Sequence, residues 1–166
     1  MKYLLSIIFL LLVVIMAMFN YSAKADEVNC LALNIYHEAR NQPFNGKLAV
    51  GYVTLNRVKS KNFPNTVCEV VKQGQISKWW KEQYGKEVPL KNKCHFSWWC
   101  DGKSDEPTEK EVWELTKALA FQMYYEQFFT FDLTGGSTHY HADYVNPYWA
   151  KKKERVIQIK NHIFYK

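Results

Sequence analysis

The chain has 166 residues, of which 48% are hydrophobic and 23% charged, and its formal net charge is +6. This composition is that of a folded protein rather than of a disordered chain, and the length suits one domain. The mild basic excess suits an anionic polymer. It is too weak to indicate a nucleic-acid-binding protein, because no nucleic-acid-binding motif accompanies it.

The first 25 residues read as a secretory signal peptide. Lys2 gives a positive start, residues 4–19 form an apolar run, and Ala23-Lys24-Ala25 is a small-residue cleavage site. We expect cleavage before Asp26, which leaves residues 26–166 as one domain and lowers the net charge from +6 to +4. The run is short for a membrane span, but an uncleaved anchor stays open as the alternative. The predicted location is therefore secreted or periplasmic.

Four cysteines follow the signal peptide: Cys30, Cys68, Cys94 and Cys100. An even number of cysteines in an exported chain predicts two disulfides, and the sequence leaves all three pairings open. The alternative is a zinc site. Five residues separate Cys94 from Cys100, which is wider than the usual zinc-binding pair.

Apolar periodicity predicts four helices, at about 26–40, 46–59, 64–71 and 108–128. We expect Asp26 to cap the first, Pro64 to open the third, and a capping box from Thr108 to Glu111 to open the fourth. The second is apolar on nearly every side, which is typical of a buried central helix. The fourth is expected to bury Val112, Leu115, Leu119 and Met123.

The rest of the chain divides into an aromatic loop and a group of strands. Residues 73–106 show no sustained period and predict a long loop held by Cys94 and Cys100, of the kind that is usually functional. Alternating patterns predict strands at 138–142, 155–159 and 162–165. Helices followed by a small antiparallel sheet in the C-terminal part indicate an α+β fold.

Glu38 is the most informative residue. It follows Leu31 and Ile35 on the same helical face, so its carboxylate lies at the border of an apolar stripe. Desolvation there raises the pKa of a carboxyl group, and a carboxylic acid that is protonated near neutral pH can act as a general acid. The plain alternative is a glutamate at a helix end paired with a nearby cation such as Arg40.

His139-Tyr140-His141-Ala142-Asp143 is the second cluster of reactive side chains. Two imidazoles and a carboxylate on one strand can bind zinc, as in cell-wall peptidases. No upstream histidine with a suitably spaced acidic partner completes that set. We therefore expect no metal, and interpret this strand as a cleft wall that binds substrate.

Aromatic residues crowd the second half of the chain, and Asn56 lies on the apolar second helix. Aromatic rings stack on sugar faces, although core packing accounts for many of them. Adjacent pairs such as Trp98-Trp99 cannot both point inward, so one ring of each pair is expected to be exposed. The amide of Asn56 can orient Glu38, bind a substrate amide, or cap a neighbouring loop.

These motifs together resemble the SleB-like cell-wall hydrolases, which include spore cortex-lytic enzymes. The resemblance rests on residues 31–40 (LALNIYHEAR), 46–58 ending in LNRV, 63–68 (FPNTVC), 96–102 (FSWWCDG), 136–142 (GSTHYHA), 147–150 (PYWA) and 161–165 (NHIFY). The resemblance does not extend over about residues 73–92 and 103–133. It implies that residues 26–166 form a lysozyme-like catalytic domain related to lytic transglycosylases.

The resemblance also implies the chemistry. Glu38 corresponds to the catalytic acid of the family, acting on peptidoglycan between MurNAc and GlcNAc without a cofactor. A glycosidase with two carboxylates needs a second acid, for which Asp101, Asp132 and Asp143 are candidates, whereas a lytic transglycosylase needs none.

We expect the protein to be a monomer that binds peptidoglycan. The residues expected to bind glycan are Asn56, Phe96, Ser97, Trp98, His139, Tyr140, His141 and Trp149. A zinc peptidase centred on His139 and His141, and a non-catalytic glycan-binding module, remain the alternatives.

Overall fold

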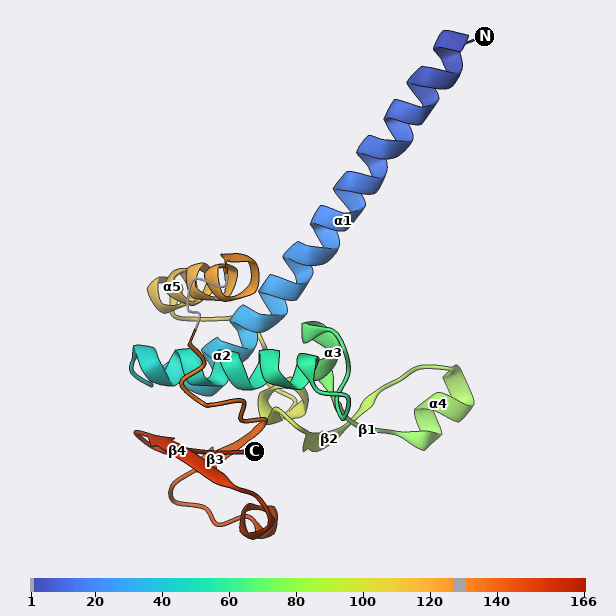
Figure 1. The fold of residues 1–166 in the computed structure, drawn as a ribbon. Helices are drawn as coiled ribbons and strands as arrows, with labels where there is room; N and C mark the ends of the chain where they lie inside the picture. The colour runs from blue at the N-terminus through green and yellow to red at the C-terminus, as the bar shows by residue number, and fades with distance from the viewer. Residues whose placement is uncertain (1, 127–130) are drawn as a thin grey trace.

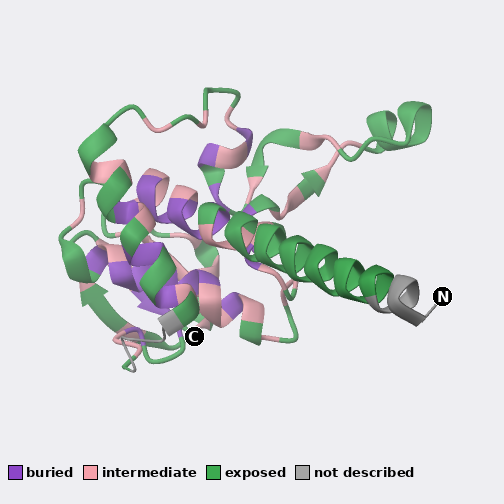
Figure 2. Cartoon of the chain, turned by 90° about the horizontal axis from the view of Figure 1, so that it is seen from above, coloured by how far each residue is buried: buried purple, intermediate pink, exposed green. Residues whose placement is uncertain are grey.

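The computed structural model describes residues 2–126 and 131–166. One long helix, α1 (Lys2–Ala39), begins far from the body and ends inside it (Figure 1). Its projecting part is exposed, whereas Leu31 and Ile35 near its end are fully buried (Figure 2). Asp26 lies within this continuous helix, so the predicted cap at Asp26 is wrong for the uncut chain.

The segment Ile7–Ala39 of α1 is long and apolar enough to cross a membrane, with a mean hydropathy of 2.0 in its most apolar window. That window is fully exposed and lies near the N-terminus, where a signal sequence has the same properties. The segment therefore fits the predicted signal peptide and an uncleaved anchor equally well.

Helix α2 (Phe44–Lys59) crosses the end of α1 and forms the centre of the core, as its apolar pattern predicts. Helix α3 (Val67–Lys72) packs against both. It begins at Val67 rather than at Pro64, because the Thr66 hydroxyl caps it by accepting the backbone N–H of Glu69. The predicted start at Pro64 is therefore wrong.

Both predicted disulfides are present, and no cysteine is free. Cys30–Cys68 joins α1 to α3, and Cys94–Cys100 closes a short loop. The structure thereby selects one of the three pairings that the sequence leaves open.

The region 73–106 is not the long irregular loop that the sequence predicts. Strands β1 (Gly74–Ile76) and β2 (Pro89–Cys94) pair antiparallel and carry helix α4 (Lys78–Tyr84) between them, followed by the 3-10 helix η1 (Ser97–Cys100). We call residues 74–94 the arm, which projects from the body (Figure 1). Its sequence lacks a period because few of its side chains face a core.

Helix α5 (Lys110–Phe121) packs against α1 and continues as a π-helical turn, η2 (Gln122–Glu126). The predicted capping box is wrong, since α5 has no side-chain cap. Instead, the Tyr36 hydroxyl accepts the backbone N–H groups of Thr108 and Glu109, each at 3.1 Å. Leu119 and Met123 are buried as predicted, but Leu115 is 66% exposed. The predicted end near residue 128 lies outside the described residues.

The C-terminal part forms the predicted antiparallel sheet, with strands β3 (His139–Ala142), β4 (Arg155–Ile159) and β5 (His162–Tyr165) in the order β3-β5-β4. The 3-10 helix η3 (Tyr148–Lys152) precedes β4. Phe164 of β5 is fully buried against Ala49 and Val53 of α2, which fixes the sheet on the helical core. The predicted α+β fold is confirmed.

Candidate active site

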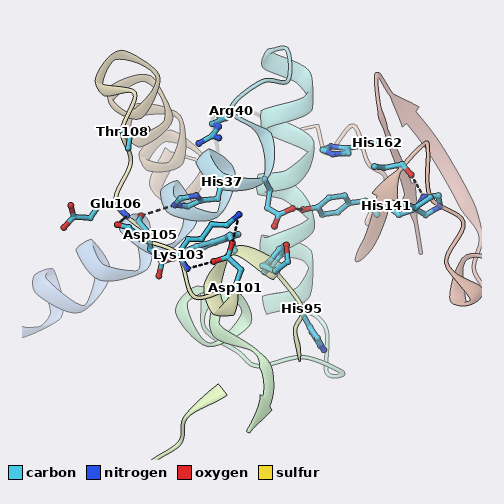
Figure 3. Close-up of a pocket in the computed structure, with 18 of the residues that line it drawn as sticks. His37, Arg40, His95, Asp101, Lys103, Asp105, Glu106, Thr108, His141 and His162 are labelled. Atoms are coloured by element: carbon cyan, nitrogen blue, oxygen red, sulfur yellow. Dashed lines mark hydrogen bonds and ion pairs between the residues drawn. The ribbon is translucent and has the colours of Figure 1, made fainter. Parts of the chain in front are cut away.

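Glu38 lies in the last turn of α1, at a cleft of about 650 Å³. Figure 3 shows His37, Asp101 and Lys103 on one side of this cleft and His141 and His162 on the other. The first side comes from α1 and the segment after η1, and the second from β3 and β5. A cleft of this volume is in the range of small-molecule and substrate sites.

Tyr140 on β3 contacts Glu38 directly. Its hydroxyl donates a hydrogen bond of 2.8 Å to Oε2 of Glu38. Burial and the neighbouring carboxylate raise the pKa of Tyr140 well above its ordinary value. The phenol therefore stays protonated and serves as a permanent donor that fixes the orientation of the carboxyl group.

Arg57 of α2 supplies a buried positive charge to the same cleft and is only 6% exposed. Its Nε donates to the carbonyl of Thr138 at 2.8 Å, and its guanidinium lies 4.7 Å from the ring centre of Phe96. Nη1 has no hydrogen-bond partner among the described residues. No role was predicted for Arg57, although its charge on a nearly apolar helix is a usable signal.

The protonation of Glu38 depends on three opposing effects. Burial raises the pKa of its carboxyl group, while the hydrogen bond from Tyr140 and the charge of Arg57 lower it. Burial is the largest effect, so the pKa lies above its ordinary value. This agrees with the expectation drawn from the helical spacing of Leu31, Ile35 and Glu38.

Phe96, Ser97 and Trp98 line the wall of the cleft together with Glu38. Trp98 is held firmly: its indole N–H donates to Oδ1 of buried Asn34 at 3.0 Å, and its ring stacks on His37 at 4.5 Å. Phe96 and Trp98 are only 2% and 8% exposed. They are therefore packed wall residues rather than the open aromatic platform that the sequence suggested.

The side chains of β3 lie in two different places. His141 and Tyr140 line the cleft, but His139 and Trp149 are not among its lining residues. Both histidine rings pack against Trp149, at 5.4 and 5.6 Å. His139 and Trp149 thus form an aromatic cluster beside the cleft rather than part of its wall.

The zinc alternative has no ligand set in the described part of the chain. No group of three or more histidine, cysteine, aspartate or glutamate side chains converges there. In addition, both ring nitrogens of His141 are within hydrogen-bond distance of protein oxygens, the carbonyl of Ala142 and the hydroxyl of Tyr165.

Asn56 lies outside the cleft wall and ties down a loop. Its amide donates to Asp132 Oδ2 at 2.8 Å and to the carbonyl of Ser137 at 3.1 Å. Asp132 also accepts the backbone N–H groups of Thr134 and Gly136. Of the three roles that the sequence left open for Asn56, the structure shows the loop cap. The same hydrogen bonds hold the carboxylate of Asp132 within that loop.

Among the candidates for a second acid, Asp101 is the one that lines the cleft with Glu38. It faces Lys103 in an ion pair of 3.7 Å and accepts the backbone N–H of that residue. Asp143 is not a lining residue. The residues that follow Asp101, from Lys103 to Glu106, also line the cleft, and the sequence did not predict them because the segment carries no periodic pattern.

Comparison with known proteins defines the class. The model of the cell wall hydrolase family matches residues 41–165, and the chain belongs to that family. The match begins three residues after Glu38. The SleB-like resemblance read from the motifs is therefore confirmed.

Two solved catalytic domains have the same fold. The catalytic domain of the germination-specific lytic transglycosylase SleB from Bacillus anthracis is 26% identical, with a TM-score of 0.59 over 84% of this chain and 93% of that one. The SleB catalytic domain from Bacillus cereus is 24% identical, with a TM-score of 0.52 over 84% and 89% of the two chains. The lysozyme-like fold is thereby confirmed.

Curated relatives match over a shorter stretch. The spore cortex-lytic enzyme of Bacillus cereus is 44% identical over 46 residues, which is 28% of this chain and 18% of that enzyme. The spore cortex-lytic enzyme of Bacillus subtilis is 41% identical over 46 residues, or 15% of its length. The matched stretch thus spans less than a fifth of these relatives.

Proposed function

We propose that this protein is an exported enzyme that cleaves the bond between MurNAc and GlcNAc in peptidoglycan, as a lytic transglycosylase with Glu38 as its acid and base. The observation that carries the proposal is the desolvated carboxyl group of Glu38, held by Tyr140 at the cleft. The fold shared with the lytic transglycosylase domain from Bacillus anthracis supports the same reaction class.

In the first step, protonated Glu38 gives its proton to the glycosidic oxygen, and the bond from that oxygen to C1 of MurNAc breaks. The N-acetyl group of the sugar stabilises the positive centre that develops at C1. Glu38 becomes an anion in a desolvated site, where the hydrogen bond from Tyr140 and the charge of Arg57 stabilise it.

In the second step, the Glu38 carboxylate takes the proton of the 6-hydroxyl of MurNAc. The oxygen of that hydroxyl bonds to C1, which closes the anhydro ring and restores the acid. The reaction therefore consumes no water: the proton that Glu38 gives to the leaving sugar stays on its new hydroxyl, and the proton of the 6-hydroxyl replaces it on Glu38.

Hydrolysis is the competing reaction, and Asp101 is the second carboxylate that it would use. It lines the same cleft as Glu38 and is only partly exposed, which suits a carboxylate that orients water toward C1. Its ion pair with Lys103 favours a structural role for this carboxylate. We therefore assign the reaction to Glu38 acting with the 6-hydroxyl of the substrate.

The test is mass spectrometry of the fragments that the protein releases from purified sacculi. The proposal predicts 1,6-anhydro-MurNAc ends. Reducing ends in their place mean hydrolysis, and new peptide termini mean a peptidase. Intact sacculi that retain bound protein mean a glycan-binding module.

Export is the second part of the proposal. The apolar segment of α1, the small-residue site before Asp26 and the two disulfides are all typical of a protein that leaves the cytoplasm. Amino-terminal sequencing of protein purified from outside the cytoplasm is expected to begin at Asp26. A first residue within 1–7 would mean that the segment stays as an anchor.

A further inference from the structure

Three aromatic side chains cluster at the tip of the arm, on α4. Trp79, Trp80 and Tyr84 are 55%, 38% and 58% exposed. Their rings contact one another, with centres 5.0 Å apart for Trp79–Trp80 and for Trp80–Tyr84. No residue of α4 is buried, so these rings contribute nothing to the core (Figure 2). An exposed aromatic group of this kind is typical of a binding surface.

The tip is also well ordered by local bonds. The Ser77 hydroxyl caps α4 by accepting the N–H of Trp80, and Gly85 ends the helix in the left-handed conformation with φ of 64°. The backbone N–H of Ser77 donates to the carbonyl of Val88 across the base of the tip. Little conformational entropy remains to be lost when such a surface binds a ligand.

The arm is strongly basic. Residues 74–94 contain five lysines and two glutamates, a net charge of +3, which is half of the formal charge of the whole chain. Lys81 pairs with Glu87, whereas Lys78, Lys86 and Lys93 are exposed and make no ion pair among the described residues. The arm therefore presents flat aromatic rings and positive charges together.

We infer that the tip of the arm is a second binding site for the glycan strand, separate from the cleft, and that its ligand is anionic peptidoglycan. Tryptophan and tyrosine rings pack on the apolar faces of sugars, and lysines pair with the carboxylates of the muramyl peptides. The inference rests on the proposed function, because that function supplies the polymer. The charge complementarity selects this ligand over a neutral polysaccharide.

The chain links this site to the cleft. Strand β2 runs from the tip to His95 and η1, and the Cys94–Cys100 bridge holds the base of the arm beside the cleft wall. A polymer bound at both sites gains from effective concentration, so even weak binding at the tip strengthens attachment to a long strand. A short glycan that fills only the cleft gains nothing.

The test compares a long and a short substrate. The double variant Trp79→Ala/Tyr84→Ala is expected to cleave purified sacculi about tenfold more slowly than the wild type, because the gain from two-site attachment is lost. Cleavage of a short soluble glycan of the same repeat is expected to stay unchanged. Phe121→Ala removes an aromatic ring of similar exposure, 49%, on α5 and serves as the matched control.

Binding is measured separately in a Glu38→Gln background, by co-sedimentation with sacculi and with phosphatidylglycerol vesicles. The aromatic double variant and Lys78→Glu/Lys86→Glu are both expected to bind sacculi more weakly, because only the cleft is left to hold the strand. Unchanged binding to sacculi, equal losses on the long and the short substrate, or a loss confined to vesicles would overturn the inference. A wild type that binds sacculi through the arm but cleaves neither substrate would refute the proposed function alone.

Discussion

Replacement of Glu38 by glutamine tests the catalytic assignment and its physical basis together. Glutamine has nearly the same shape and accepts the hydrogen bond from Tyr140, but it cannot donate a proton to the glycosidic oxygen. Loss of a general acid costs about a hundred- to ten-thousand-fold in rate. We therefore expect cleavage of sacculi to fall by at least the lower of these factors while the protein stays folded.

The same substitution is expected to stabilise the protein at neutral pH. Because burial raises the pKa of Glu38 in the fold, the folded state binds this proton more tightly than the unfolded state does. The free energy of unfolding of the wild type therefore falls as the pH rises from the unfolded pKa, near 4.5, through the folded pKa. Each unit of elevation corresponds to about 1.4 kcal/mol, and glutamine removes this penalty.

The measurement is urea unfolding of both proteins between pH 4 and pH 8. The stability difference is expected to be near zero at the acidic end and to grow toward neutral pH. Glu111→Gln, at an exposed glutamate of α5, is the control and is expected to change neither activity nor the pH dependence. A Glu38→Gln protein that is less stable than the wild type at pH 7 would refute the argument from burial.

Three further predictions concern the surroundings of Glu38 and the two disulfides. Tyr140→Phe removes a hydrogen bond that lowers the pKa of Glu38, so the basic limb of the pH profile of kcat/KM is expected to move to higher pH; an unchanged profile would show that the contact does not exist in solution. Cys30→Ser/Cys68→Ser opens a loop of 38 residues and is expected to lower the free energy of unfolding by about 4 kcal/mol. Cys94→Ser/Cys100→Ser opens a loop of only 6 residues and is expected to lower it by about 2 kcal/mol. Denaturant titration measures both losses, and equal losses would contradict the chain-entropy argument. EDTA is expected to leave cleavage of sacculi unchanged, and a loss that zinc alone restores would favour the peptidase alternative.

Short-range patterns predicted most of the regular structure. The apolar period of α2 and the alternation of β3, β4 and β5 reflect burial against one core, and each of these elements occurs close to its predicted bounds. Glu38 could be singled out for the same reason, since a helical face is determined by residues a few positions apart.

Features that depend on distant residues could not be predicted in this way. Tyr36 replaces the expected capping box at the start of α5, although more than 70 residues separate them. The disulfide pairing, the contact of Tyr140 with Glu38 and the loop cap by Asn56 are likewise tertiary. The arm escaped prediction for a different reason: without a buried face, its helix and strands leave no apolar period in the sequence.

The continuity of α1 has a mechanical consequence. At 1.5 Å per residue, about 28 Å of unbroken helix lies between Phe19, where the apolar run ends, and Glu38. In any molecule that keeps this segment in a membrane, the helix acts as a rigid spacer, and the Cys30–Cys68 bridge clamps its inner end to α3. Such an enzyme can work only on strands at that fixed height above the lipid, and removal of the segment releases it to act throughout the wall.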